Sequence, residues 1–184
     1  HQGVIAYAAA KEYVSVEDIL NIARSRGEAP FVVICDDITD PHNLGSIIRS
    51  ANAAGVHGVI ISKHNSVGLS ATVAKTSAGA VEFTSVAKVP SIAQTIEKLK
   101  KENIWVVAAD MDGENTIHTH DFSGAVAIVV GNEGKGISHL VKERCDFTVR
   151  IPMLGKISSL NASVAGALMI YEVVRYREAK KQEV

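Results

Sequence analysis

Side chains able to bind an anion or to position a reacting group gather in three short stretches of the sequence. The first runs from Asp40 to Arg49 and reads Asp-Pro-His-Asn-Leu-Gly-Ser-Ile-Ile-Arg. Asn43 stands where a helix is expected to begin, which is a common place for Asn. Arg49 falls near the middle of that otherwise small and apolar helix. An arginine there belongs either to a pocket or to a structural salt bridge with Asp36, Asp37 or Glu133.

The second stretch, Gly131 to Gly136, reads Gly-Asn-Glu-Gly-Lys-Gly and lies between an apolar run and a helix pattern. Ligands of α/β proteins bind at the carboxyl ends of strands, so a ligand loop is expected here, with a ligand-free tight turn as the alternative. The glycine order GxxGxG differs from the dinucleotide fingerprint GxGxxG. No Lys-Ser or Lys-Thr pair follows the last glycine, as a P-loop requires. The loop therefore favours neither a nicotinamide cofactor nor a nucleoside triphosphate.

The third stretch runs from Val149 to Ser163. Pro152 cannot donate to a sheet and ends a short strand, and a polar loop follows. Either Ser159 or Asn161 caps the last helix, whose free backbone N–H groups would form a pocket rim. Taken alone, however, the stretch is more typical of an ordinary βα turn over a core helix. Its first turns carry small residues, which predicts a close neighbour. These residues are Ala162, Ala165, Gly166 and Ala167.

Two further clusters give weaker signals. The segment from Asp110 to Glu114 resembles a calcium loop, but its spacing places Asn115 where that loop needs glycine. The run from His118 to Asp121 contains metal-ligating side chains without a partner elsewhere in the pattern. A solvated loop is the better interpretation of both, and no metal site is predicted. Cys35 lies inside an apolar run, which is typical of a buried, inert thiol.

Apolar runs alternate with helix patterns along the whole chain, which predicts an α/β fold with a mainly parallel sheet flanked by helices. The expected strands cover residues 4–7, 31–38, 57–62, 82–86, 104–109, 125–130 and 147–151. The expected helices cover residues 15–25, 44–54, 70–75, 90–103, 138–145 and the C-terminal segment.

Composition sets the class of protein. The chain has 184 residues with a formal net charge of −1, which fits one domain with a full core and gives no global attraction to nucleic acid. No apolar run is long enough to span a membrane and no signal peptide is visible, so a cytoplasmic protein without a membrane partner is expected.

The three stretches together resemble the SpoU (TrmH-like) family of RNA ribose 2′-O-methyltransferases, within the SPOUT superfamily. The resemblance covers residues 30–177, and the motifs occur in the family's order. The opening residues, His1 to Ala6, resemble the linker after the small substrate-binding domain of bacterial enzymes that methylate a guanosine of large-subunit ribosomal RNA. Residues 1–30 are accordingly expected to be an entry arm from an absent N-terminal domain, and residues 31–184 the SPOUT methyltransferase domain.

The resemblance implies a C-terminal trefoil knot that binds S-adenosylmethionine. The implied cofactor-binding residues are Gly131, Asn132, Gly134, Gly136, Ile151, Met153, Ser159 and Leu160. The implied catalytic residues are Asn43, Arg49, Glu133, Ser159 and Asn161. Lys135 and Lys156 are given only an RNA-contact role.

The implied reaction transfers a methyl group to a ribose 2′-hydroxyl, with a guanosine of 23S ribosomal RNA as the first substrate and a transfer RNA guanosine as the alternative. A non-catalytic RNA-binding module of the same fold is a second hypothesis, and a nicotinamide oxidoreductase a third. The resemblance also implies a homodimer. The apolar face of the last helix, formed by Val164, Leu168, Tyr171 and Val174, is long enough to form the interface.

Overall fold

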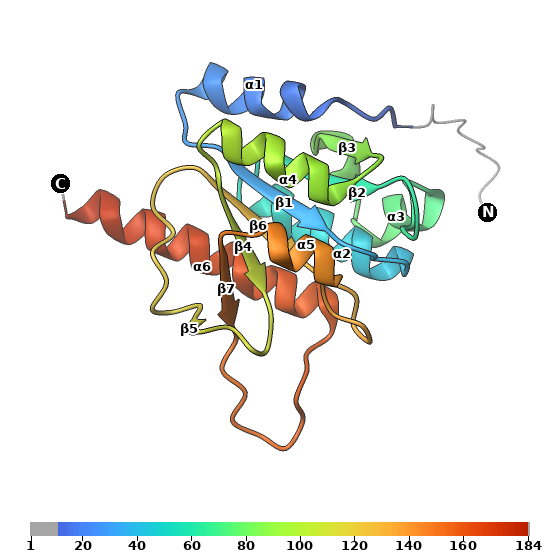
Figure 1. Cartoon of the computed structure of the whole chain (residues 1–184). Coiled ribbons are helices and arrows are strands. Elements are labelled where there is room, and N and C mark those ends of the chain that lie inside the picture. The colour runs from blue at the N-terminus through green and yellow to red at the C-terminus, as the bar shows by residue number, and fades with distance from the viewer. Residues whose placement is uncertain (1–10, 184) are drawn as a thin grey trace.

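A seven-stranded, entirely parallel sheet forms the centre of the computed structural model, which describes residues 11–183 (Figure 1). The strand order is β3-β2-β1-β6-β4-β7-β5. The strands are Phe31–Cys35 (β1), Gly58–Ser62 (β2), Val86–Val89 (β3), Trp105–Ala109 (β4), Asn115–Thr116 (β5), Val126–Val130 (β6) and Phe147–Arg150 (β7). The expected α/β class with a parallel sheet is confirmed.

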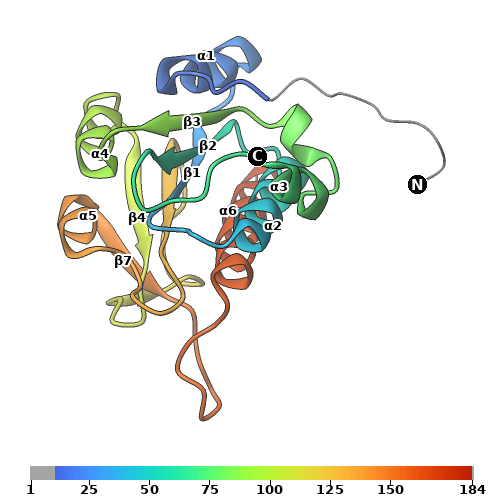
Figure 2. The ribbon, with the colours of Figure 1, turned by 90° about the vertical axis from the view of Figure 1, so that its right-hand side faces the viewer.

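Helices cover both faces of the sheet, because alternate residues of each central strand point to opposite sides. Figure 2 shows α4 and α5 on one side and α2, α3 and α6 on the other. Val33 and Ile128 pack with the α2 and α6 layer, and Ile34 and Val129 pack with the α4 layer. The helices are Val16–Arg26 (α1), Pro41–Ala53 (α2), Ala71–Thr76 (α3), Ile92–Lys101 (α4), His139–Arg144 (α5) and Ala162–Gln182 (α6).

The segment before β1 packs onto the sheet. Ser15 and Asp18 form a capping box that begins α1, and Ile19 and Leu20 of this helix are buried in the core. Val14 forms a parallel bridge with Ala87 of β3, so the edge of the sheet is partly covered. The strand expected at residues 4–7 lies outside the described residues, and the assignment of residues 1–30 to a linker stays a prediction.

The strand expected at residues 82–86 is wrong. Residues Ala80–Phe83 form a single 3₁₀ turn (η1) after Gly79, whose φ of 82° is left-handed. Phe83 is 83% exposed, so its apolar side chain does not mark a buried strand. The strand begins at Val86, which pairs with Val59 of β2.

The region 110–124, expected to be a polar excursion, is partly buried. Asn115 and Thr116 pair with β7, and Ile117, His120 and Phe122 have exposed fractions of 8% or less. These side chains pack against the edge of the sheet, which anchors the region.

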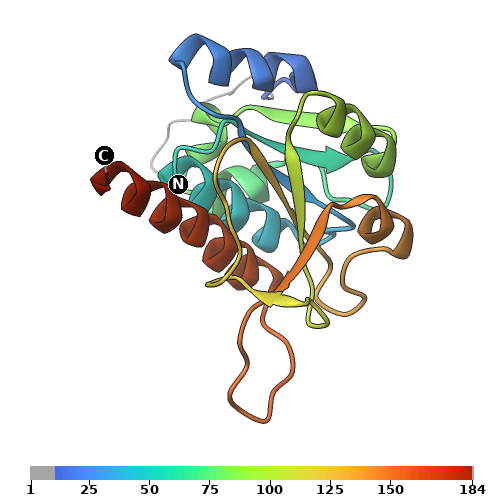
Figure 3. The ribbon, with the colours of Figure 1, turned by 60° about the vertical axis from the view of Figure 1, so that its left-hand side comes forward.

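Residues 151–161 leave β7, project from the body of the molecule and return to the start of α6 (Figure 3). Leu154 is 98% exposed and Ile157 is 72% exposed at the tip of this loop. The trefoil knot stays a prediction. Within residues 11–183, no helix combines the length and the apolar character needed to cross a bilayer.

Candidate active site

A cleft of about 540 Å³ opens at the carboxyl ends of β4, β6 and β7. Its walls come from residues 109–112, 130–137 and 151–160, from Lys142 of α5 and from the first turns of α6. All eight residues predicted to bind the cofactor line this cleft. They are Gly131, Asn132, Gly134, Gly136, Ile151, Met153, Ser159 and Leu160.

The loop after β6 is held by Asn132. The backbone N–H groups of Asn132 and Gly136 each donate to the other's carbonyl oxygen, at 3.1 and 2.8 Å. The Asn132 side chain accepts from the N–H groups of Gly134 and Lys135 and donates through Nδ2 to the carbonyl oxygen of Asp37. The loop also closes on itself, because a Cβ at Gly131 would lie 2.4 Å from the Gly136 carbonyl carbon. Asn132 therefore shapes the cleft, and its side chain is already engaged.

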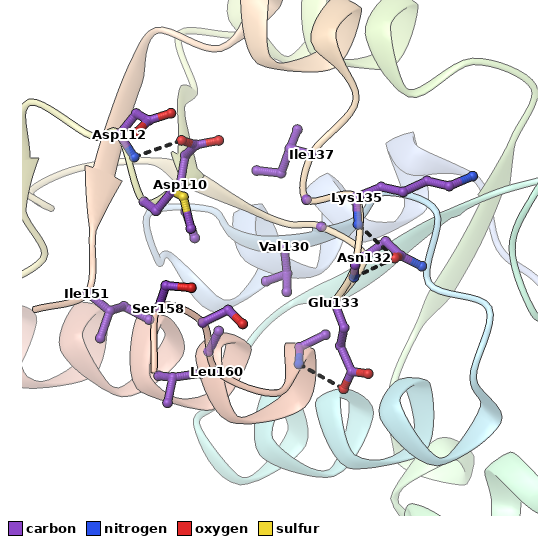
Figure 4. A pocket seen from close by; sticks show the side chains of 18 of the residues that line it. Asp110, Asp112, Val130, Asn132, Glu133, Lys135, Ile137, Ile151, Ser158 and Leu160 are labelled. Carbon is purple, nitrogen blue, oxygen red and sulfur yellow. Dashed lines mark hydrogen bonds between the residues drawn. The ribbon is translucent and has the colours of Figure 1, made fainter. Parts of the chain in front are cut away.

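Glu133 joins three parts of the chain that are distant in the sequence. Its Oε1 accepts from Asn43 Nδ2 of α2 at 3.1 Å and from the Ala162 N–H of α6 at 3.2 Å. Asn161 Nδ2 also donates to this oxygen and, at 3.0 Å, to Asn43 Oδ1. Figure 4 shows Glu133 at one end of the cleft, with its bond to the start of α6. The structure thus unites three of the five predicted catalytic residues.

Asn161, rather than Ser159, is the cap of α6. Its Oδ1 accepts from the N–H groups of Ser163 and Val164 at 3.0 and 3.3 Å. The carboxylate of Glu133 at this helix N-terminus is also favoured by the helix dipole. Farther along α6, a Cβ at Gly166 would lie 3.4 Å from Ile47 Cγ1, so its close neighbours are side chains rather than backbone.

The other two predicted catalytic residues lie apart from this cluster. Ser159 lines the cleft, and Arg49 does not. Arg49 is exposed on α2, and within residues 11–183 it has neither an ion pair nor a side-chain hydrogen bond. The structural salt bridge considered for Arg49 is therefore not observed. Six residues beyond Asn43, Arg49 lies about 9 Å along the helix axis and about 120° around it.

Two residues that follow β1, Asp36 and Asp37, contact the segments that form the cleft. Asp36 is 3% exposed and accepts from the Ser138 N–H at 2.7 Å, which ties β1 to the start of α5. Asp37 has a left-handed φ of 53°. Burial, and then the charge of Asp36, raises the pKa of the Asp37 carboxyl. Asp36 and Asp37 belong to no recognisable motif, so sequence reasoning missed their contacts with the segments that form the cleft.

Sequence reasoning also missed the ion pair of Asp110 and Lys142. Asp110 Oδ2 lies 2.9 Å from Lys142 Nζ, and both residues line the cleft. Because Asp110 follows β4 and Lys142 belongs to α5, only the strand order β6-β4-β7 brings them together. The position of Asp110 directly after a strand was the available signal.

Three comparisons place this geometry among known proteins. Residues 30–171 match the model of the SpoU rRNA Methylase family. The protein YacO of Bacillus subtilis (strain 168), described as a "Putative TrmH family tRNA/rRNA methyltransferase", is 49% identical over 177 residues, which cover 96% of this chain and 71% of YacO.

Solved structures share the fold. The SpoU methyltransferase AviRb from Streptomyces viridochromogenes, solved in complex with AdoMet (S-adenosylmethionine), has a TM-score of 0.77 and 34% identity, covering 83% of this chain. A structure described as an RNA 2′-O ribose methyltransferase has a TM-score of 0.74 and 30% identity, covering 91% of this chain. The matched part is 60% of each of those two chains.

Proposed function

The chain belongs to the SpoU rRNA methylase family of RNA methyltransferases, and on that premise we propose that it methylates a ribose 2′-hydroxyl of structured RNA with S-adenosylmethionine as the donor. The observation that carries the proposal is the cluster of Asn43, Glu133 and Asn161 at one end of the cleft. The same cluster argues against a non-catalytic RNA-binding module, because a module without chemistry does not need it. The glycine order in residues 131–136 gives the nicotinamide oxidoreductase no support.

The cleft fits the proposed cofactor in size and in chemistry. Its volume of about 540 Å³ lies in the range of small-molecule sites. Ile137, Ile151 and Leu160 provide apolar walls for a planar base, and the loop backbone provides hydrogen-bonding groups. When bound there, the sulfonium group of S-adenosylmethionine supplies an activated methyl group and a sulfide leaving group.

The residues of the chain then have to align the acceptor. Glu133 holds the side-chain amides of Asn43 and Asn161 in fixed positions. A rigid arrangement of this kind lowers the entropy that the reacting groups lose when they meet in line. Ser159, which is exposed on the cleft wall, offers a hydroxyl that is free to turn toward the acceptor.

Arg49 is proposed to act on the RNA rather than on the cofactor. Its guanidinium is protonated at ordinary pH and cannot serve as a base. A planar fork of donors suits a phosphate beside the target ribose and stabilises negative charge developing on the 2′-oxygen. Its exposed position, with no ion pair to any residue from 11 to 183, leaves it available for that contact. A phosphate oxygen or a water molecule then accepts the hydroxyl proton.

The proposed substrate is a guanosine of 23S ribosomal RNA, with a transfer RNA guanosine as the second candidate. The proposed assembly is a homodimer through α6, where Val164, Leu168 and Tyr171 are between 42% and 49% exposed. These side chains form an apolar stripe that a two-fold contact would bury.

The test is to incubate the protein with methyl-labelled S-adenosylmethionine and either 23S ribosomal RNA or total transfer RNA, and to map the label. Label on a ribose 2′-oxygen of a ribosomal guanosine is the expected result. Label on a base contradicts the proposed reaction, and label on transfer RNA alone contradicts the first substrate. The Glu133→Ala variant is the control, since a contaminating enzyme would leave its signal unchanged.

A further inference from the structure

The turn after β4 carries a motif that the proposed catalytic cluster does not use. Asp110 and Asp112 line the cleft at the end opposite Glu133, and Figure 4 shows the apolar side chains of Val130 and Ile137 between the two ends. The sequence alone favoured a solvated loop for these carboxylates. Their position in the cleft gives them access to a ligand.

The Asp110 carboxylate is fixed from both sides. Oδ1 accepts from the Asp112 N–H at 2.9 Å, and Oδ2 pairs with Lys142 Nζ at 2.9 Å. The backbone is held as well, since the Asp110 N–H donates to the Val149 carbonyl of β7 and the Gly113 N–H donates to the Asp110 carbonyl, at 2.9 and 3.1 Å. The Asp110 side chain is 14% exposed. A carboxylate oxygen accepts more than one hydrogen bond, so this group retains acceptor capacity toward the cleft.

The two ends of the cleft suit different halves of the proposed cofactor. The Glu133 end is built from side-chain amides and the start of α6, and it suits the charged sulfonium and amino-acid half. Apolar side chains line the path from there to Asp110, and they suit the faces of a purine ring. The adenosine half, with its ribose hydroxyls and 6-amino group as donors, would therefore lie toward Asp110.

We propose, resting on the function proposed above, that Asp110 is a specificity-determining residue that accepts a hydrogen bond from the adenosine half of the cofactor, and that Lys142 is its positioning residue. The ribose hydroxyls and the 6-amino group are the two donor sources. Lys142 holds the carboxylate in one orientation and balances its charge, which keeps the partly buried carboxylate from opposing folding.

The test is a cycle of protein variants and ligand analogues, measured by isothermal titration calorimetry without RNA. The probes are S-adenosylhomocysteine, its 2′-deoxy and 3′-deoxy analogues, and S-inosylhomocysteine, which lacks the 6-amino group. In the wild-type protein, one of these changes should weaken binding by about ten- to a hundredfold, the scale of a hydrogen bond to a charged group. The Asp110→Asn variant should bind S-adenosylhomocysteine about as weakly as the wild-type protein binds that analogue. The analogue itself should bind this variant only slightly more weakly than S-adenosylhomocysteine does.

The donor is the group missing from the analogue whose affinity relative to S-adenosylhomocysteine is low in the wild-type protein and close to one in Asp110→Asn. If every analogue keeps the same affinity ratio to S-adenosylhomocysteine in both proteins, the inference is overturned while the proposed function stands. If the wild-type protein does not bind S-adenosylhomocysteine, the proposed function itself fails.

Two variants guard against misfolding. Lys142→Met keeps the Asp110 carboxylate and removes its ion pair, so it should weaken S-adenosylhomocysteine binding several-fold. It should also reduce the affinity difference between S-adenosylhomocysteine and the analogue that lacks the donor. If that affinity difference is as large in Lys142→Met as in the wild-type protein, Lys142 does not position Asp110. Glu143→Gln, one residue along α5 and paired outside the cleft with His139, is the matched control and should bind all four probes as the wild type does.

Discussion

Adding one negative charge to the Asn43–Glu133–Asn161 cluster should uncover the coupling between α2 and the loop after β6. In Asn43→Asp, a second carboxylate replaces the amide that donates to Glu133 at 3.1 Å. At that separation and an effective dielectric constant of about 40, for a site between the surface and the interior, two unit charges repel by about 3 kcal/mol. The lost hydrogen bond adds about 1 kcal/mol. The free energy of unfolding should therefore fall by about 4 kcal/mol.

The same substitution in a Glu133→Gln background should cost only about 1 kcal/mol, because the repulsion is gone and the lost hydrogen bond remains. The coupling free energy of the double-mutant cycle is then about 3 kcal/mol, which urea unfolding resolves as a shift of the midpoint by about 1 M or more. Asn52→Asp, an exposed isosteric change on the same helix, is the control and should alter stability by about 0.5 kcal/mol. Equal costs of Asn43→Asp in the two backgrounds would refute the contact.

Four further outcomes are expected. Arg49→Lys should lower turnover by about a hundredfold, with cofactor affinity and melting temperature nearly unchanged; a loss of turnover that follows thermal stability would contradict the phosphate contact. Leu168→Glu should shift the mass found by light scattering from dimer to monomer, since the side chain is 42% exposed in the single chain. Gly45→Ala should destabilise the fold by about 1–3 kcal/mol, because the new Cβ would lie 1.8 Å from Thr76 Oγ1, and part of the loss should return with Thr76→Ala. Burial lowers the pKa of His120, so as the pH falls through the ordinary histidine range the unfolded chain takes up a proton more readily than the folded chain does, and stability falls as the pH falls; His120→Gln should flatten that part of a pH series of thermal melts.

The fold class could be predicted because the strands are short apolar runs separated by strong helix boundaries. Phe31–Cys35 and Val126–Val130 are buried at every position, as expected for central parallel strands. The strand expected at residues 82–86 was misplaced because Phe83, followed by the β-branched Thr84, has the composition of a strand and yet is exposed to solvent. Only the pairing of Val86 with Val59 decides where that edge strand begins.

The residues that line the cleft could be predicted from motifs, because the loops that form the cleft are each continuous in the sequence. The contacts between loops could not. Asp110 meets Lys142, and Asn43 meets Glu133 90 residues away, only because the sheet places their strands as neighbours. The exposed position of Arg49 on α2 also depends on which face of that helix packs against α6, and its spacing from Asn43 alone does not reveal this.

Asn161 has one further consequence, for local fluctuations of the native protein. Its Oδ1 caps the first turn of α6 while its Nδ2 binds Glu133 and Asn43, so the helix end cannot fray without dissolving the cluster. The amide hydrogens of Ser163 and Val164 then exchange with solvent only when both structures open together. The hydrogen-exchange rates of these two amides would therefore show whether the Asn43–Glu133–Asn161 cluster is formed, without a measurement of catalytic activity.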